Sequence, residues 1–237
     1  MAQCARLPSS NNNNQQNSNK TYMANNNLWT DSYWLLLMQA CKKKPDDVKS
    51  PWSKTMVDLA IELHIHPKTL FEKMEQLLDH KTASLQKIWD TYADNTRRLN
   101  KDAKRVREMK GFGDADSFFM GVESIDSFET FYLPVADDTK LTPAALTILI
   151  DLYFMLTPNT MVEETPEVAD VARMLTLTTK EVVEVLAIFQ TFDPILKRKA
   201  MPTSALVEAA RKVWDEYAND TQNMNDKKER ALAYYHK

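Results

Sequence analysis

The sequence predicts an all-α protein built from two tandem helical repeats, and three observations support this prediction. Apolar residues recur at helical spacing, and no segment alternates apolar and polar residues as a half-buried strand does. Blocks of sequence in the first half return in the same order in the second half. Glycine is scarce, with 3 residues where roughly 17 are usual for this length. Hairpin-rich folds are therefore disfavoured, because their tight turns need glycine.

The internal repeat rests on matched blocks at nearly constant separation. The hexapeptide IWDTYA from Ile88 matches VWDEYA from Val213 at an offset of 125 residues. Upstream, DLAxxLxI from Asp58 matches DVAxxLxL from Asp170 at an offset of 112 residues. The change in offset predicts an insertion in the second copy between about residues 192 and 210.

We therefore expect four segments along the chain. Residues 1–27 are Asn/Gln-rich and predicted to be disordered, residues 28–110 and 141–237 are the two helical repeats, and residues 111–140 are an acidic, aromatic linker. Residues 1–110 have a net charge of +6 and residues 111–237 one of −9. We expect the linker to dock between the repeats or on the basic last helix of the first repeat. Its aromatic residues are Phe112, Phe118, Phe119, Phe128, Phe131 and Tyr132.

The first repeat divides into helices by its caps and apolar spacing. Asp31 or Ser32 is expected to cap the first helix and Ser53 the second. His66-Pro67 opens the next helix, since Pro is favoured at the first helical position. The apolar faces are predicted at Leu35, Leu36 and Met38, then at Met56, Leu59 and Leu63, and in the last helix at Leu99, Ala103, Val106 and Met109.

The second repeat has comparable boundaries. Thr142-Pro143 and Thr165-Pro166 each place a capping hydroxyl before a proline, and Thr178-Thr179 opens a further helix. The aromatic residues of the hexapeptide, Trp89 and Tyr92, lie three apart on one helical face, and we predict that they are core residues.

The stretch from Leu59 to Leu70 resembles the helix-turn-helix of bacterial transcription regulators and of the promoter-reading domain of sigma factors. It has an apolar and then a small residue, Leu59 and Ala60, on its first helix, and Leu63 and Ile65 bracket the turn. The small residue lets the two helices cross closely. The resemblance implies a DNA-binding domain whose second helix reads the duplex. The second repeat matches with Val171, Ala172, Leu175, Leu177, Val182 and Val185.

Both repeats depart from that pattern at the turn, where glycine is usual. His64 and Thr176 stand there, and a β-branched threonine tolerates a positive φ poorly. We therefore expect the second repeat to make a different turn. Its second helix also carries Glu181 and Glu184, which makes it a poor DNA reader because acidic side chains repel phosphate.

Several function classes are disfavoured by what the sequence lacks. The three glycines, Gly111, Gly113 and Gly121, form no phosphate-binding loop. Cys4 and Cys41 form neither a disulfide framework nor a zinc site. We expect no catalytic residues, no metal, no cofactor, no small-molecule substrate and no membrane span, and a cytoplasmic location. The histidines His64, His66 and His80 are predicted to be turn residues, and the lysines after Cys41 are expected to activate its thiol.

Two functions remain open. The leading hypothesis is a non-enzymatic regulatory protein in which the first repeat binds DNA. The alternative is a protein-interaction scaffold that uses the same folds, with a protein partner or a second copy and without nucleic-acid contact. The candidate base-contacting residues are Lys68, Thr69, Lys73 and Gln76, and the candidate phosphate-contacting residues are Arg97, Arg98, Lys101, Lys104 and Arg105.

Overall fold

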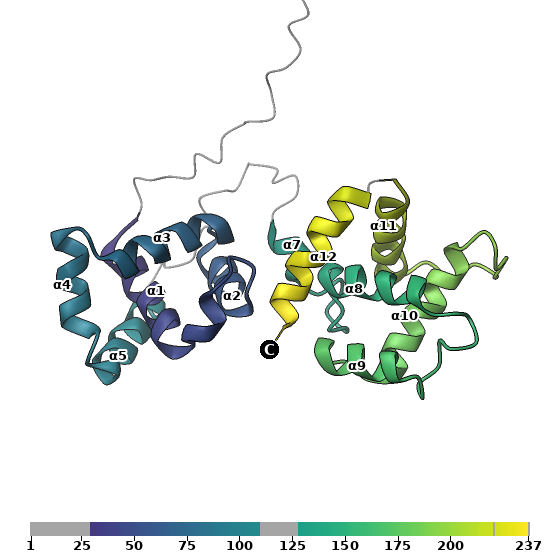
Figure 1. The fold of residues 1–237 in the computed structure, drawn as a ribbon, viewed down its shortest axis with the longest axis horizontal. Helices are drawn as coiled ribbons and strands as arrows, with labels where there is room; N and C mark the ends of the chain where they lie inside the picture. Colours follow the sequence, from purple (N-terminus) through teal and green to yellow (C-terminus); the bar gives the residue numbers. More distant parts are fainter. Residues whose placement is uncertain (1–28, 110–127, 220, 237) are drawn as a thin grey trace, which may run out of the picture. The chain divides into compact units, whose positions relative to one another are not determined.

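The prediction of an all-α fold is confirmed. The computed structural model describes residues 29–109, 128–219 and 221–236, and these residues form helices and no strand (Figure 1). Asp31–Lys237 forms one compact unit. The predicted disordered segment, residues 1–27, lies outside the described residues.

The first group of helices packs around α1. Its members are α1 (Asp31–Lys43), the 3-10 turn η2 (Pro45–Val48), α2 (Lys54–Leu63), α3 (Pro67–Asp79), α4 (Ala83–Tyr92) and α5 (Thr96–Arg107). Leu36, Leu37 and Met38 of α1 are fully buried, because α1 packs against α2, α3 and α5. In Figure 1, α1 lies between α3 and α5. The predicted apolar faces of these helices are buried, except that Met109 is 57% exposed, since α5 ends two residues before it.

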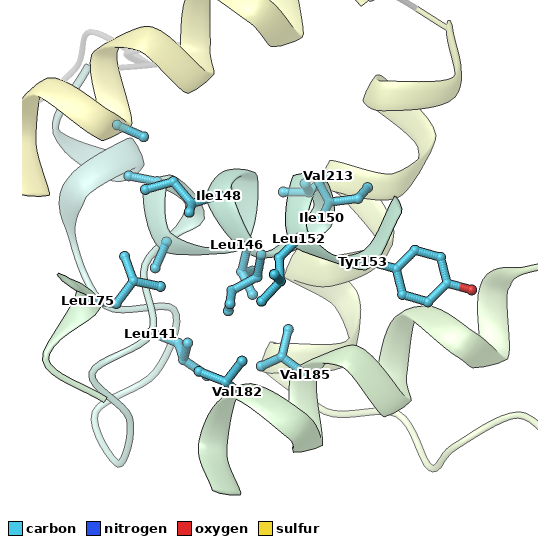
Figure 2. Close-up of a cluster of buried hydrophobic side chains, with 14 of the residues drawn as sticks. Leu141, Leu146, Ile148, Ile150, Leu152, Tyr153, Leu175, Val182, Val185 and Val213 are labelled. Carbon is cyan, nitrogen blue, oxygen red and sulfur yellow. The ribbon is translucent and has the colours of Figure 1, made fainter. Parts of the chain in front are cut away.

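The second group of helices surrounds α8. Its members are α7 (Phe128–Tyr132), α8 (Pro143–Met155), α9 (Pro166–Leu175), α10 (Thr179–Phe192), α11 (Ala205–Asn219) and α12 (Thr221–Tyr235). A helix that is apolar all round is expected to be buried on every side, and α8 packs against all five of the others. Figure 2 shows Leu146, Ile148 and Leu152 of α8 beside side chains from the surrounding helices, among them Leu175, Val182, Val185 and Val213.

The α2–α3 and α9–α10 turns have the same geometry, so the expectation of a different turn at Thr176 is wrong. His64 has φ 51° and ψ 38°, and Thr176 has φ 59° and ψ 37°. The amide of Leu177 donates to the carbonyl of Ala172 (2.9 Å), as that of Ile65 does to Ala60 (3.0 Å). We attribute the left-handed Thr176 to its surroundings, which fix the chain on both sides. Leu175 is buried before it, and a reciprocal cap between Thr178 and Glu181 begins the next helix.

The helix caps follow the sequence predictions in part. Thr165 occupies the N-cap of α9 without a cap hydrogen bond, and its hydroxyl donates instead to the carbonyl of Thr160. Thr142 accepts a hydrogen bond from the amide of Ala145, and His66 accepts one from Lys68. Ser53 occupies the N-cap of α2, but its side chain makes no cap hydrogen bond, and its buried hydroxyl has no partner in the described part of the chain. Asp31 and Ser32 are the first two residues of α1 rather than flanking caps.

The described part of the linker docks against helices, as predicted. Tyr132 is buried and its ring lies 4.8 Å from that of Tyr234 in α12. Phe128 contacts the ring of His66 at 5.5 Å, edge to face, and Glu129 lies 3.0 Å from Nδ1 of His64. Helix α7 therefore packs between the α2–α3 turn and the second group. Phe112, Phe118 and Phe119 lie outside the described residues.

Candidate nucleic-acid interface

Helix α5 carries the densest row of exposed positive charge. Arg97, Lys101, Lys104 and Arg105 are exposed and recur at helical spacing, so they share one face over about 12 Å of helix. The opposite face is held to α1 by the buried residues Leu99, Ala103 and Val106, which leaves the basic face directed away from the core.

The charges on this face differ in how far they are already neutralised. Arg98 and Arg105 flank Asp102 at 3.7 and 4.0 Å, and Lys104 lies 3.6 Å from Glu108. Arg97 and Lys101 make no ion pair within the described residues. These exposed pairs are weak in water, so all five side chains can still contact a polyanion.

Arg107 belongs to the structure rather than to this face. Its guanidinium donates to both carboxylate oxygens of Glu62 in α2, at 2.5 and 3.2 Å, and to Gln39 in α1 at 2.6 Å. Gln39 in turn donates to Asn100 (2.8 Å). This network joins three helices and fixes the orientation of α5, a role that the charge pattern of the sequence does not distinguish from phosphate binding.

Helix α3 offers a less favourable surface than the sequence predicts. Lys68 and Gln76 are exposed, whereas Thr69 and Lys73 are half-buried. The ammonium of Lys68 lies 5.9 Å from the ring centre of Trp52, and that of Lys73 lies 6.0 Å from that of Trp34. The exposed acids Glu72, Glu75 and Asp79 share this helix and outnumber its two lysines.

The structure does not bring the two predicted sets of residues together. Helices α3 and α5 each pack against α1, which lies between them in Figure 1. A second basic group lies at the end of α1, beside α4. Lys42, at the C-terminal end of α1, places its ammonium 5.1 Å from the ring of Trp89 in α4, and α4 directly precedes α5.

The histidines are turn residues, as predicted. His64 and His80 end α2 and α3 with left-handed backbone conformations, and His66 caps α3. His80 stacks on Trp89 with ring centres 5.2 Å apart. Burial, with the nearby charges of Lys68 and Arg230, lowers the pKa of His66. Among the described residues, no three His, Cys, Asp or Glu side chains gather closely enough to hold a metal ion.

Two further sequence expectations need correction. Trp89 and Tyr92 are half-buried rather than core residues; Tyr92 donates to Asp102 (3.1 Å) and Trp89 lies between a lysine and a histidine. Cys41 is buried, and burial raises the pKa of its thiol to about 11. The adjacent lysines point outward and do not activate it, because a buried thiol is not a thiolate at neutral pH.

The second group of helices has exposed apolar side chains that sequence patterns did not indicate. Phe154, Met155 and Ile195 are 50%, 69% and 84% exposed. A sequence signal was present in part, because Ile195 lies in the segment predicted to be an insertion and is followed by Lys197-Arg198-Lys199.

In comparisons with known proteins, no family model, no curated protein and no solved structure matches the chain. In the part of the chain that the structure describes, no helix has the length and apolar character needed to cross a membrane.

Proposed function

We propose that this protein is a non-enzymatic nucleic-acid-binding protein whose helix α5 contacts the phosphate backbone. The observation that carries the proposal is the exposed basic face of α5, on which Arg97 and Lys101 have no acidic partner among the described residues. Phosphate contacts by such side chains supply most non-specific affinity. The exposed lysines at the end of α1 add positive charge to the same group of helices.

The proposal assigns base reading a smaller part than phosphate binding. The base-contacting candidates on α3 share their helix with Glu72, Glu75 and Asp79, which a duplex would bring close to its own phosphates. We propose that binding depends only weakly on sequence, with Lys68 and Gln76 making any direct base contacts.

We also propose that the α2–α3 and α9–α10 pairs are two copies of one helix-turn-helix-like unit. The matching left-handed residues and the equivalent amide-to-carbonyl bonds at the two turns support this. The second copy would have kept the packing and lost part of the basic surface, because Glu181 and Val185 stand where the first copy has Thr69 and Lys73.

The salt dependence of duplex binding tests the main proposal. The measurement is fluorescence anisotropy of the full chain with random-sequence duplex DNA between about 50 and 200 mM salt. Replacing Arg97, Arg98, Lys101 and Lys104 with Gln removes up to four phosphate contacts. The slope of log K against log salt should then fall by up to about 3.5.

A matched control carries the same charge change elsewhere. Replacing Lys197, Arg198, Lys199 and Lys212 with Gln also removes four exposed positive charges, and it should leave the slope nearly unchanged. If the α5 variant keeps the parent slope, or if the two variants lose it equally, α5 is not the phosphate-binding surface.

A protein-interaction scaffold is the second candidate function, and the exposure of Phe154, Met155 and Ile195 favours it. Contiguous exposed apolar side chains on a folded protein commonly mark a binding surface. A second copy of the chain is one possible partner, and light scattering over a range of protein concentrations distinguishes a dimer from a monomer.

A further inference from the structure

The second group of helices carries a surface that we name the α8–loop patch. It comprises the exposed end of α8 and the segment between α10 and α11, and its members are Phe154, Met155, Ile195, Lys197, Arg198 and Lys199. Three of them are large apolar side chains and three are basic. Ile195 is the most exposed of the three apolar side chains, with 84% of its surface open to solvent. Contact between apolar surface and water is unfavourable, so this exposure does not stabilise the fold.

The segment that carries Ile195 is joined to the end of α8 by hydrogen bonds. One carboxylate oxygen of Asp193 accepts from the hydroxyl of Tyr153 (2.8 Å), and the other accepts from the amide of Ile195 (2.8 Å). The same carboxylate therefore joins the end of α8 to the segment carrying Ile195. A preorganised surface loses less entropy on binding than a mobile one.

Aromatic side chains of α11 pack against Phe154. The ring of Phe154 stacks on Tyr217 with centres 4.7 Å apart and planes at 13°, and it lies 5.6 Å from Trp214. Phe192 is covered by the guanidinium of Arg211 at 3.8 Å. Phe154 is thus fixed by its neighbours while half of its surface stays exposed.

The charge of this segment is opposite to that of its surroundings. From Asp193 to Lys212 the chain carries five basic and two acidic residues, whereas residues 111–237 as a whole carry 12 and 21. Several other basic residues of this half are paired, as Lys227 is with Glu216 and Lys228 with Asp151. Within the described residues, Lys197, Arg198 and Lys199 make no ion pair, and Lys197 holds a left-handed φ of 49°.

We propose that the α8–loop patch docks a short segment of a partner protein that carries acidic residues beside large apolar ones. The unpaired basic side chains complement carboxylates, and Ile195, Met155 and Phe154 bury apolar side chains of the partner. The proposal rests on the scaffold function above and is independent of nucleic-acid binding by α5.

The surroundings of the patch favour a short protein segment over other anionic partners. Nucleic acid and anionic membranes are extended polyanions, and they would bring further negative charge against the acidic remainder of this half. A short segment touches the patch alone. Exposed isoleucine and methionine also suit packing against side chains better than stacking on bases, for which aromatic rings are used.

Selection from a random peptide library on the immobilised full chain tests the proposal. We expect the recovered peptides to combine Asp or Glu with Leu, Ile, Phe or Trp. Their affinity, measured by anisotropy with a labelled peptide, should fall by at least about tenfold in two separate variants, Met155→Ser with Ile195→Ser, and Lys197→Gln with Arg198→Gln and Lys199→Gln.

Matched controls place the same changes elsewhere. Leu133→Ser with Val162→Ser alters two exposed apolar side chains, and Arg97→Gln with Arg98→Gln and Lys101→Gln removes three positive charges from α5. Both controls should change the affinity by less than about twofold. All changed side chains are exposed, so equal melting temperatures will show that each variant is folded.

The outcomes separate the patch from the broader scaffold function. Peptides that bind equally to parent and patch variants overturn the patch and leave a scaffold function in place. Recovery of no acidic–apolar consensus overturns the docking proposal, and light scattering then tests the scaffold function separately. Patch-dependent binding of a poly-dT oligonucleotide or of phosphatidylserine-containing vesicles, with no peptide bound, overturns the proposed partner class.

Discussion

Two residues that occupy the same position at the start of a helix differ in what their hydroxyls do. Thr142 of α8 accepts from the amide of Ala145 (3.0 Å) and is paired with the hydroxyl of Tyr235 (2.9 Å). Ser53 of α2 is buried as well, yet its hydroxyl has no hydrogen-bond partner in the described part of the chain. Sequence alone assigns both the same capping role.

Substitution by alanine should therefore affect the two caps differently. Thr142→Ala removes a cap and a second hydrogen bond and should lower the free energy of unfolding by about 1–2 kcal/mol. Ser53→Ala removes an unsatisfied buried hydroxyl and should be neutral or stabilising, by up to about 1 kcal/mol. Urea denaturation monitored by circular dichroism measures both. A loss above about 1 kcal/mol in the Ser53 variant, which is the size typical of a working helix cap, would contradict this assignment.

His66 gives the fold a pH dependence whose sign follows from its environment. Burial is the main cause of its lowered pKa, and Lys68 and Arg230 add to it, so the unfolded chain takes up this proton more readily than the folded one. The stability that neutral His66 contributes is fully present above the ordinary histidine pKa of about 6.5. It is lost as the pH falls below that value, by at most about 1.4 kcal/mol per pH unit.

Replacing His66 with Asn isolates that contribution, because Asn keeps a side-chain acceptor at the N-cap of α3. The free energy of unfolding of the variant, measured between about pH 5 and pH 7.5, should depend less steeply on pH than that of the parent. If parent and variant show the same slope, His66 does not contribute to it.

At the scale of elements, the two faces of α5 have different surroundings. Its apolar face and Arg107 attach it to α1 and α2, and its other face presents the basic row. We expect substitutions on the first face to change the free energy of unfolding, and substitutions on the second face to change the proposed binding of DNA.

A double-mutant cycle between Arg107 and Glu62 tests the structural face. Each side chain is a little over one third exposed, and the bidentate geometry favours a coupling energy of about 0.5–1 kcal/mol that weakens in salt. Arg107→Gln and Glu62→Gln, alone and together, should give this coupling in urea denaturation. Arg107→Gln should also leave the salt slope of DNA binding unchanged; a loss equal to that of an α5 surface arginine would place Arg107 in the interface.

The elements that the sequence predicts well are those whose apolar spacing alone determines burial. Leu99, Ala103 and Val106 define α5, and Thr142 with Pro143 marks the start of α8. The turn at Thr176 could not be predicted from propensity, because packing on both sides of it overrides the steric cost of a positive φ at threonine.

The candidate site was less predictable than the fold. The basic row of α5 is visible in the sequence, but its separation from Lys68 and Gln76 depends on how α1 packs between two helices. In the sequence, Arg107 is a basic residue at helical spacing like the others of α5. Only the position of Glu62 in the fold distinguishes it from the arginines of the basic face. Exposure of Met155 and Ile195 depends on helices distant in sequence, which local pattern does not encode.

At the scale of the whole molecule, α2 shares buried surface with the second group of helices. Val57 lies in the same buried cluster as Tyr132 and Tyr234. Lys54 of α2 donates to the hydroxyl of Tyr234 (2.9 Å), which donates to Asp58 (3.1 Å). Burial opposes the charged form of Lys54, but the hydrogen bond to Tyr234 and the charge of Asp58 outweigh it, so the pKa of Lys54 is raised.

Removing the Tyr234 hydroxyl should therefore weaken this contact. Tyr234→Phe keeps the ring and should lower the free energy of unfolding by about 1 kcal/mol. Tyr217→Phe is the matched control, because its hydroxyl makes no hydrogen bond within the described residues, and it should be nearly neutral. Equal effects in the two variants would show that the Lys54–Tyr234–Asp58 chain contributes nothing.

The burial of α8 on every side has a consequence for the order in which the chain is made. Its apolar surface is complete at Met155, but the helix that covers it last, α12, ends at Tyr235. At ribosomal speeds of roughly 5–20 residues per second, the intervening residues take on the order of 4–16 s to emerge. During that time the nascent chain exposes its most apolar helix to the ribosome surface, to chaperones and to neighbouring nascent chains.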